Sequence, residues 1–279
     1  MFALFLRNPV CLTTAFTTHT FAATRTIMAT ATIVTTRYEL LKDIELKSFE
    51  MDARSFKASE LWKSKPVLVL VTRRPGCQFC REEAKELAAR RDLIQNKLGV
   101  DMVSVIHERL GQEEFNENFW KGTMYWDEKK AFYLALGGGR FRMGGLTTFL
   151  KPSVWINYAR NKKRGVAGNF KGDGRYLGGM LIMRPGDAGP SYEYREQVFG
   201  DSPPLDVVLR ACRDLSDQRN DPEVSRLVDE EIERVVAERE KRDPEAEAPV
   251  CEMRRERQEG KERNLEVEAS ACEMPKRER

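Results

Sequence analysis

The sequence predicts an α/β domain of three layers, in which helices cover both faces of a central sheet. Two observations lead to this prediction. A continuous apolar run, typical of a strand that is buried on both faces, occurs at residues 66–71, and a second, mostly apolar run that we expect to be a strand occurs at 100–106. Segments with the helical spacing of apolar residues alternate with these runs and with further strand patterns, which is the order found in α/β domains. The predicted domain spans residues 39–217 of the 279-residue chain.

The elements follow one another along this domain. Apolar residues within 40–49 suit a short helix or helix-turn, and those within 56–62 suit another, before the strand at 66–71. A longer helix is expected from Cys80 onward, and Gly99 makes a good stop for it. After the strand at 100–106 we expect a helix near 112–120, a strand at 123–126, a helix starting at the N-cap Asp127 and ending before Gly137, strands at 177–183 and 191–195, and a closing helix at 205–215.

The N-terminal residues 1–38 differ from the domain. They contain no Asp or Glu, and they carry three arginines and eleven threonines. An acid-free, hydroxyl-rich segment of this kind is typical of organelle transit peptides, so we expect import into a mitochondrion or plastid. The alternative is a disordered leader, or initiation at Met28, on a cytoplasmic protein.

The C-terminal residues 218–279 form a third region. More than half of residues 221–279 are charged, with both signs mixed. An apolar stripe predicts an amphipathic helix at 223–241, and beyond Pro244 we expect disorder. This region is either a solvated tail, which the composition favours, or an arm that binds a partner or forms a coiled coil.

Composition excludes several classes of function. The net charge of +3 is small against 47 basic and 44 acidic residues, so nucleic-acid binding is not expected. Since no run of about 20 uncharged apolar residues occurs, neither is a membrane-spanning helix. The six cysteines include one close pair only, which suits a reducing compartment better than a disulfide framework.

The close pair, Cys77 and Cys80, carries the most specific signal. It follows a buried strand and a Pro-Gly turn and opens a helix, where free N–H groups and the helix dipole stabilise a thiolate. Cys80 is in register with the apolar face of the helix, whereas Cys77 lies at the open helix end. We therefore predict that Cys77 attacks and that Cys80 resolves. Arg73 and Arg74 either stabilise the thiolate and bind an anionic substrate group, or are ordinary surface charges.

Other interpretations of the pair are possible. A zinc half-site needs further ligands, and the chain offers only His19 and His107, so no metal is expected. The pair can instead consist of two buried structural cysteines. His107 itself is a candidate acid or base, or a satisfied histidine at a strand end. The glycine-rich segment at 165–179 either shapes a pocket beside the cysteines or is a plain loop.

The run Arg73-Arg74-Pro75-Gly76-Cys77-Gln78-Phe79-Cys80-Arg81 is similar to that of the peroxiredoxin-like 2 family. The resemblance extends from about residue 40 to 215, and its further matches are at 41–47, 56–62, 125–133, 168–174 and 177–179. It implies a thioredoxin-like fold with a mixed sheet, and an antioxidant or redox-regulatory thiol activity that uses Cys77 and Cys80. It also implies that no cofactor is bound and that a thioredoxin or glutathione system supplies electrons. The substrate would be a peroxide, an endoperoxide or a disulfide.

Two alternatives accompany this interpretation. One is an endoperoxide reductase similar to the prostamide/prostaglandin F synthases of the same family. The other is a non-catalytic redox-sensing or interaction module. Peroxiredoxins proper place a Pro and a Thr before the reactive cysteine. Arg73 and Cys77 stand at those places when Cys80 is aligned with the reactive cysteine, and Arg74 stands at the Thr place when Cys77 is aligned with it. We therefore expect slow reaction with hydrogen peroxide and faster reaction with a bulkier substrate that contacts Phe79 and the glycine-rich segment.

Overall fold

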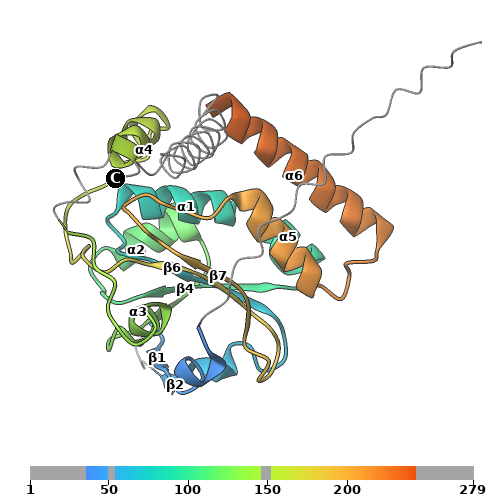
Figure 1. Cartoon of the computed structure of the whole chain (residues 1–279), viewed down its shortest axis with the longest axis horizontal. Helices are drawn as coiled ribbons and strands as arrows, with labels where there is room; N and C mark the ends of the chain where they lie inside the picture. The colour runs from blue at the N-terminus through green and yellow to red at the C-terminus, as the bar shows by residue number, and fades with distance from the viewer. Residues whose placement is uncertain (1–35, 50–53, 146–151, 243–279) are drawn as a thin grey trace, which may run out of the picture. The chain divides into compact units, whose positions relative to one another are not determined.

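A computed structural model describes residues 36–49, 54–145 and 152–242 of the chain (Figure 1). These residues belong to one compact unit. The predicted transit peptide lies almost wholly outside the described residues, as does the predicted disorder beyond Pro244. Three of the six cysteines, Cys11, Cys251 and Cys272, are also outside them.

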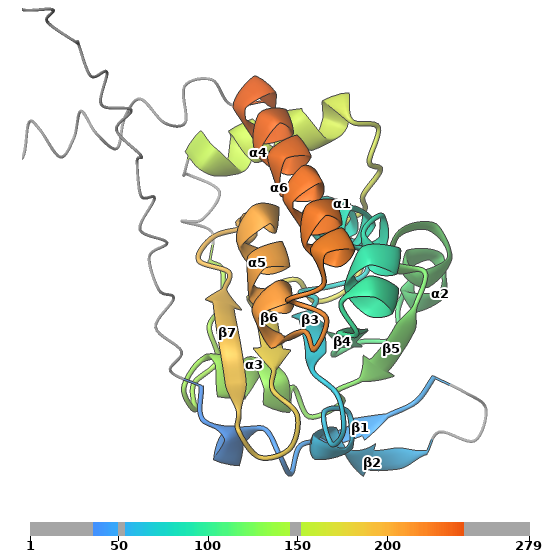
Figure 2. The same ribbon diagram turned by 90° about the vertical axis from the view of Figure 1, so that its right-hand side faces the viewer.

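A seven-stranded mixed sheet forms the centre of the unit (Figures 1 and 2). Its strands are β1 (Glu45–Lys47), β2 (Ser55–Lys57), β3 (Val67–Val71), β4 (Asp101–Ile106), β5 (Thr123–Trp126), β6 (Gly179–Met183) and β7 (Pro190–Arg195), in the spatial order β2-β1-β5-β4-β3-β6-β7. The neighbours β3, β4 and β5 run parallel, and every other adjacent pair is antiparallel. This is the predicted thioredoxin-like α/β fold, and β3, an interior strand between β4 and β6, leads directly into the cysteine pair.

Helices cover both faces of the sheet (Figure 1). One face carries α1 (Gln78–Ala88), η3 (Asp92–Lys97), α2 (Gln112–Phe115), η4 (Asn116–Trp120), α5 (Leu205–Leu215) and α6 (Pro222–Arg242), while α4 (Pro152–Lys163) contacts α1. The other face carries α3 (Ala131–Leu136) and the short turns η1 (Tyr38–Leu40) and η2 (Ala58–Glu60). Successive side chains of β3 alternate between the two cores, because side chains of a strand point to opposite faces. Both cores therefore hold β3 in place.

Three local predictions differ from the structure. The two helical segments expected within 40–62 are an antiparallel hairpin, β1 and β2, flanked by single turns of 3₁₀ helix. No helix was predicted at 152–163, where the structure has α4. Asp127 is not the N-cap residue of α3, which begins at Ala131, but its carboxylate accepts the N–H groups of Ala131 (2.9 Å) and Phe132 (2.8 Å). It therefore satisfies the free donors of the first helical turn from a greater distance along the chain.

Helix α6 is the predicted amphipathic helix, and it packs on the domain rather than extending into solvent. Its residues Val228, Ile232 and Val235 are at most 4% exposed and belong to the same core as Val208 and Leu209 of α5. Residue 217 is therefore not the edge of the packed region, and a solvated tail is the wrong description of residues 222–242. Within the described ranges, no helix has the length and apolar character needed to cross a membrane.

Candidate active site

The cysteine pair lies where β3 passes into α1. Cys77 is the N-cap residue of α1, and its backbone is extended, with φ −71° and ψ 124°. Its sulfur accepts the backbone N–H of Cys80 at 3.5 Å, which is the capping contact that satisfies a free donor of the first helical turn. Both residues are free thiols in the structure. The site is therefore described in its reduced state, with the Cys77 sulfur at the positive end of the helix dipole.

Arg73 is held against the Cys77 sulfur. Its Nη2 donates to Cys77 Sγ at 2.7 Å and its Nη1 donates to the carbonyl of Gly174 at 2.8 Å. The guanidinium stacks on the Phe199 ring, 4.2 Å from its centre, and Nε lies 3.6 Å from a Glu196 carboxylate oxygen. These contacts fix the guanidinium from several sides, so its charge is directed at the sulfur.

Arg74 turns in a different direction from Arg73. Its Nη1 donates to the carbonyl of Lys171 at 2.7 Å, and its guanidinium lies 5.8 Å from the centre of the Phe170 ring. Only 6% of Arg73 and 7% of Arg74 is exposed, so the alternative that both are ordinary surface charges is wrong. Arg73 contacts the sulfur directly, whereas Arg74 faces the space in front of it.

The two thiols have opposite acidities. Burial raises the pKa of Cys77, but hydrogen bonds from Cys80 and the charge of Arg73 outweigh it and hold that pKa well below its ordinary value. The hydrogen bond that the Cys80 thiol donates to Cys77, together with burial, raises the pKa of Cys80 well above its ordinary value. The Cys77 thiol is therefore the more acidic of the two.

The exposure of the two cysteines is the opposite of what their positions in the helix predicted. The expected open end of the helix is covered, and Cys77 is 0% exposed, whereas Cys80 is 7% exposed. Arg73 and the segment that contains Gly174 cover the sulfur of Cys77, a tertiary contact that periodicity within one helix does not report. The acidity of Cys77 comes from its partners, because its burial works against it.

A cavity of about 1040 Å³ lies in front of Cys77. We call it the Cys77 cavity. Its apolar lining consists of Phe79, Met143, Tyr158, Val166, Ala167, Phe170 and Phe199. Its charged lining consists of Arg73, Arg74, Lys162, Arg175 and one acidic residue, Asp173. The size is at the upper end of the roughly 300–1,000 Å³ that ligand pockets occupy, and the lining suits a molecule that is both apolar and negatively charged.

The glycine-rich segment forms one wall of the Cys77 cavity, as one of the two sequence interpretations expected. A Cβ atom on Gly174 would lie 2.7 Å from Arg74 Nε and 2.9 Å from Arg73 Nη1. A Cβ atom on Gly168 would lie 2.8 Å from the backbone nitrogen of Gln78. The segment also binds the turn directly, because Asn169 N–H donates to the carbonyl of Gly76 at 2.8 Å. Glycine is needed where this backbone approaches the arginines and the helix start.

A second, smaller cavity of about 180 Å³ lies on the other side of the pair. We call it the Cys80 cavity. Cys80 lines this cavity and Cys77 does not, whereas Cys77 lines the Cys77 cavity and Cys80 does not. Six of its lining residues are acidic, namely Glu82, Glu83, Glu86, Glu196, Asp201 and Asp206, and three are basic, namely Arg73, Arg164 and Arg239. Arg73 and Phe79 line both cavities and separate them.

Two acidic side chains of the Cys80 cavity titrate abnormally. Burial raises the pKa of Glu196 to about 7, although Arg73 and the N–H of Gly178 oppose that change. Burial, and then the neighbouring Glu196, raises the pKa of Glu83 well above its ordinary value. Sequence reasoning identified neither residue as part of the site. Glu196 follows β7, and only the pairing of β7 with β6 brings it near Arg73.

The remaining candidates are not part of the reactive centre. His107 Nε2 lies 3.0 Å from the carbonyl of Arg73, its ring packs against Tyr133 and Tyr176, and burial lowers its pKa. It lines neither cavity, in agreement with a satisfied histidine at a strand end. Cys212 is a core residue of α5, where burial raises its pKa to about 12. Nowhere in the described residues do three or more His, Cys, Asp or Glu side chains group as metal ligands.

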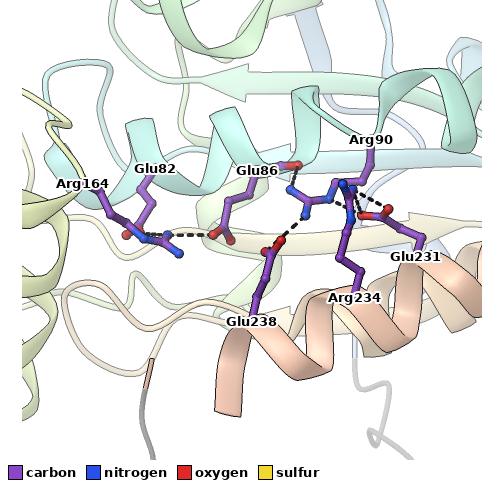
Figure 3. Close-up of polar contacts among 7 residues, drawn as sticks. All are labelled: Glu82, Glu86, Arg90, Arg164, Glu231, Arg234 and Glu238. Atoms are coloured by element: carbon purple, nitrogen blue, oxygen red, sulfur yellow. Dashed lines mark hydrogen bonds and ion pairs between the residues drawn. The ribbon is translucent and has the colours of Figure 1, made fainter. Parts of the chain in front are cut away.

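A network of ion pairs fixes α1 behind the cysteines (Figure 3). Glu82 and Glu86, on one face of α1, both accept from Arg164, which follows α4. Arg90 donates to Glu231 of α6 at 2.8 Å and to the carbonyl of Glu86 at 3.1 Å. Helices α4 and α6 are therefore both tied to the helix that carries the reactive pair.

The chain is similar to known antioxidant and peroxiredoxin-like proteins. The family described as AhpC/TSA antioxidant enzyme matches residues 86–198. Two proteins named peroxiredoxin-like 2A, from Gallus gallus and Homo sapiens, are 40% and 37% identical over 181 residues, which is 64% of this chain and 79% and 77% of those proteins. A crystal structure of peroxiredoxin 6 from Arenicola marina is 13% identical over 64% of this chain and 72% of its own, with a TM-score of 0.43.

Proposed function

Since this chain belongs to the peroxiredoxin-like 2 family, we propose that it is a thiol-dependent reductase in which Cys77 attacks the substrate and Cys80 resolves the product. The family match and the fold identify a thioredoxin-like redox protein. The contact that supports the finer assignment is the hydrogen bond from Arg73 Nη2 to Cys77 Sγ, at 2.7 Å. It stabilises the thiolate, which is the form of cysteine that acts as a nucleophile.

The proposed reaction has two steps. The Cys77 thiolate attacks one oxygen of a hydroperoxide, the O–O bond breaks, and the alcohol leaves with a proton, so that Cys77 becomes a sulfenic acid. The Cys80 sulfur then attacks Cys77, water leaves, and a Cys77–Cys80 disulfide forms. The hydrogen bond from the backbone N–H of Cys80 to the Cys77 sulfur holds the two residues side by side for this second step. An external thiol restores the pair, and no bound cofactor takes part.

The lining of the Cys77 cavity supports a bulky, anionic substrate. Phe170 is 86% exposed and Met143 is 50% exposed, so large apolar side chains remain accessible around the cavity. Arg74 and Lys162 supply positive charge at the same cavity. A fatty-acid hydroperoxide combines an apolar chain with a carboxylate and fits this lining better than hydrogen peroxide, which gains no binding energy from either feature.

Turnover with a panel of substrates tests the proposal. The full chain, with a thiol recycling system, is assayed with hydrogen peroxide, a fatty-acid hydroperoxide, its methyl ester, an endoperoxide and a disulfide. We expect kcat/KM to be highest for the fatty-acid hydroperoxide and lower for its uncharged ester. Hydrogen peroxide as the best substrate would contradict the proposed substrate class. The endoperoxide as the best substrate would instead favour the prostaglandin F synthase-like alternative.

Two variants separate the roles of the cysteines. Cys77→Ser is expected to abolish turnover, and Cys80→Ser to retain the first attack and accumulate sulfenic acid at Cys77, detected by mass spectrometry after trapping. Unchanged turnover in Cys77→Ser would reject the assignment. Formation of the disulfide without turnover on any substrate would favour the redox-sensing alternative over an enzyme.

A further inference from the structure

The two cysteines of the pair line separate cavities. Cys77 lines the large Cys77 cavity and Cys80 lines the small Cys80 cavity, and Arg73 and Phe79 stand between them. Cys80 is the more exposed of the two, at 7% against 0%. The lining of the Cys77 cavity therefore offers Cys77 to a bound molecule, and the lining of the Cys80 cavity offers Cys80.

The cavities also carry opposite charge. The Cys77 cavity has four basic lining residues and one acidic residue, whereas the Cys80 cavity has three basic and six acidic residues. Some acidic side chains of the Cys80 cavity are paired, as Asp206 is with Arg239, and Glu83 and Glu196 have raised pKa values. The excess of acidic groups still disfavours an anionic molecule there, relative to the basic Cys77 cavity.

The chemistry of disulfide exchange favours attack on Cys80. A thiolate that attacks a disulfide expels the other sulfur, and a sulfur with the lower pKa leaves faster. Attack on Cys80 expels Cys77, whose negative charge is received by Arg73 Nη2 at 2.7 Å and by the N–H of Cys80. Attack on Cys77 would expel Cys80, for which the structure provides no such arginine contact among its described hydrogen bonds.

We propose that the Cys80 cavity is the entry site for the reducing thiol, and that this thiol attacks Cys80 of the oxidised pair while the substrate uses the Cys77 cavity. This inference rests on the proposed function, because it requires the Cys77–Cys80 disulfide. The cavity volume of about 180 Å³ and the excess of acidic groups select a small thiol that is uncharged or positively charged. A protein reductant would need a more accessible sulfur than either of these.

The step balances as an ordinary exchange. The thiolate of the reductant forms a bond to Cys80 Sγ, the Cys77–Cys80 bond breaks, and the electron pair leaves on Cys77 Sγ as a thiolate. A second reductant thiolate then attacks the reductant sulfur of this mixed disulfide, the bond from that sulfur to Cys80 Sγ breaks, and the two reductant sulfurs form a disulfide. Cys80 leaves as a thiolate and accepts a proton. The pair is reduced by two electrons and two thiols of the reductant are oxidised.

Reduction by thiols of different charge tests this route. The full chain is first oxidised with diamide, and mass spectrometry confirms the Cys77–Cys80 disulfide. Its reduction is then followed with cysteamine, 2-mercaptoethanol and mercaptopropionate, with each rate divided by the thiolate concentration. We expect the cationic thiol to be faster than the anionic one by about threefold to tenfold, and the difference to shrink at high salt. A preference for the anionic thiol would place reduction in the Cys77 cavity and overturn the proposal.

Paired charge variants locate the entry site. Ser202 is exposed and lines only the Cys80 cavity, and Met143 is 50% exposed and lines only the Cys77 cavity. Ser202→Glu should increase, and Ser202→Lys decrease, the cationic preference in reduction without changing the rate of oxidation by substrate. The same two substitutions at Met143 are the matched control and should change substrate oxidation only.

The outcomes separate this proposal from the proposed function. If no Cys77–Cys80 disulfide forms under diamide, the proposed function fails before reduction is measured. If the disulfide forms but reduction responds to charge at Met143 and not at Ser202, the proposed function stands and the separate entry site is wrong.

Discussion

Arg73, which is buried, and Arg90, whose side chain is 10% exposed, each lie beside a glutamate near one end of α1, and they use their charge in different ways. Arg90 Nε is 2.8 Å from Glu231, and the same guanidinium binds the carbonyl of Glu86 (Figure 3). Arg73 Nε is 3.6 Å from Glu196, and its Nη2 instead donates to the Cys77 sulfur at 2.7 Å. The positive charge of Arg90 is neutralised by the nearby Glu231 carboxylate, and this ion pair holds α6 on α1. The carboxylate of Glu196 lies farther from Arg73, so the charge of Arg73 remains available to stabilise a thiolate at Cys77.

We expect the largest effect from deleting α6, because this deletion removes the carboxylates that bind Arg90. Deleting residues 218–279 also exposes the surface under Val228, Ile232 and Val235, each at most 4% exposed. We expect a loss of roughly 5 kcal/mol in the free energy of unfolding, at about 1.5–3 kcal/mol for each buried side chain, measured by denaturant titration. Deleting only residues 243–279 is the control and should leave stability unchanged; equal stability of the two deletions would show that α6 is dispensable.

The glutamate partner of Arg73 makes stability depend on pH. The pKa of Glu196 is raised from its ordinary value of 4.5 to about 7, so between these two pH values the folded state binds more protons than the unfolded state. Stability should therefore fall as pH rises through this range, by up to about 3 kcal/mol from this one group. Glu196→Gln should flatten the profile in urea titrations at pH 4.5 to 7.5. An unchanged slope in this variant would show that Glu196 is not the group responsible.

The sequence identified the parts of this comparison that depend on local pattern. The strand β3 was predicted because it is a continuous apolar run, β4 because its residues are mostly apolar, and α5 was predicted at its observed bounds. The hairpin of β1 and β2 was missed because three-residue strands are too short to show a period of two. Arg73 was predicted beside the cysteines because it is four residues from Cys77. Glu196 was not, because the sheet brings it there from a distant part of the chain.

The burial of Cys77 and Cys80 could not be predicted from the sequence either. Helix position alone placed Cys77 at an open end and Cys80 in the core, but the covering contact of Arg73 with Gly174 comes from a separate segment. The division into two cavities likewise depends on α4, α6 and the glycine-rich segment meeting around α1. None of these contacts has a signal in the spacing of residues near the pair.

The smallest expected effect on stability comes from the Arg90 side of the comparison. Arg90→Met removes a hydrogen-bonded ion pair whose side chains are 10% and 13% exposed. We expect a loss of about 1–2 kcal/mol in the free energy of unfolding, because Glu231 keeps its contact with Arg234. The rate of Cys77 alkylation should be the same as in the wild-type protein. A changed alkylation rate would mean that the ion pairs behind α1 also tune the thiol.

The most direct test of the role of Arg73 is the pKa of Cys77, measured as alkylation rate against pH and as ultraviolet thiolate absorbance. The wild-type protein should show a midpoint clearly below the roughly 8.5 of free cysteine, assigned to Cys77 by its loss in Cys77→Ser. Arg73→Met should raise that midpoint by about 1–3 units, whereas Arg90→Met should leave it in place. A wild-type midpoint at or above the value of free cysteine, or one that Arg73→Met does not move, would contradict the activation of Cys77 by Arg73.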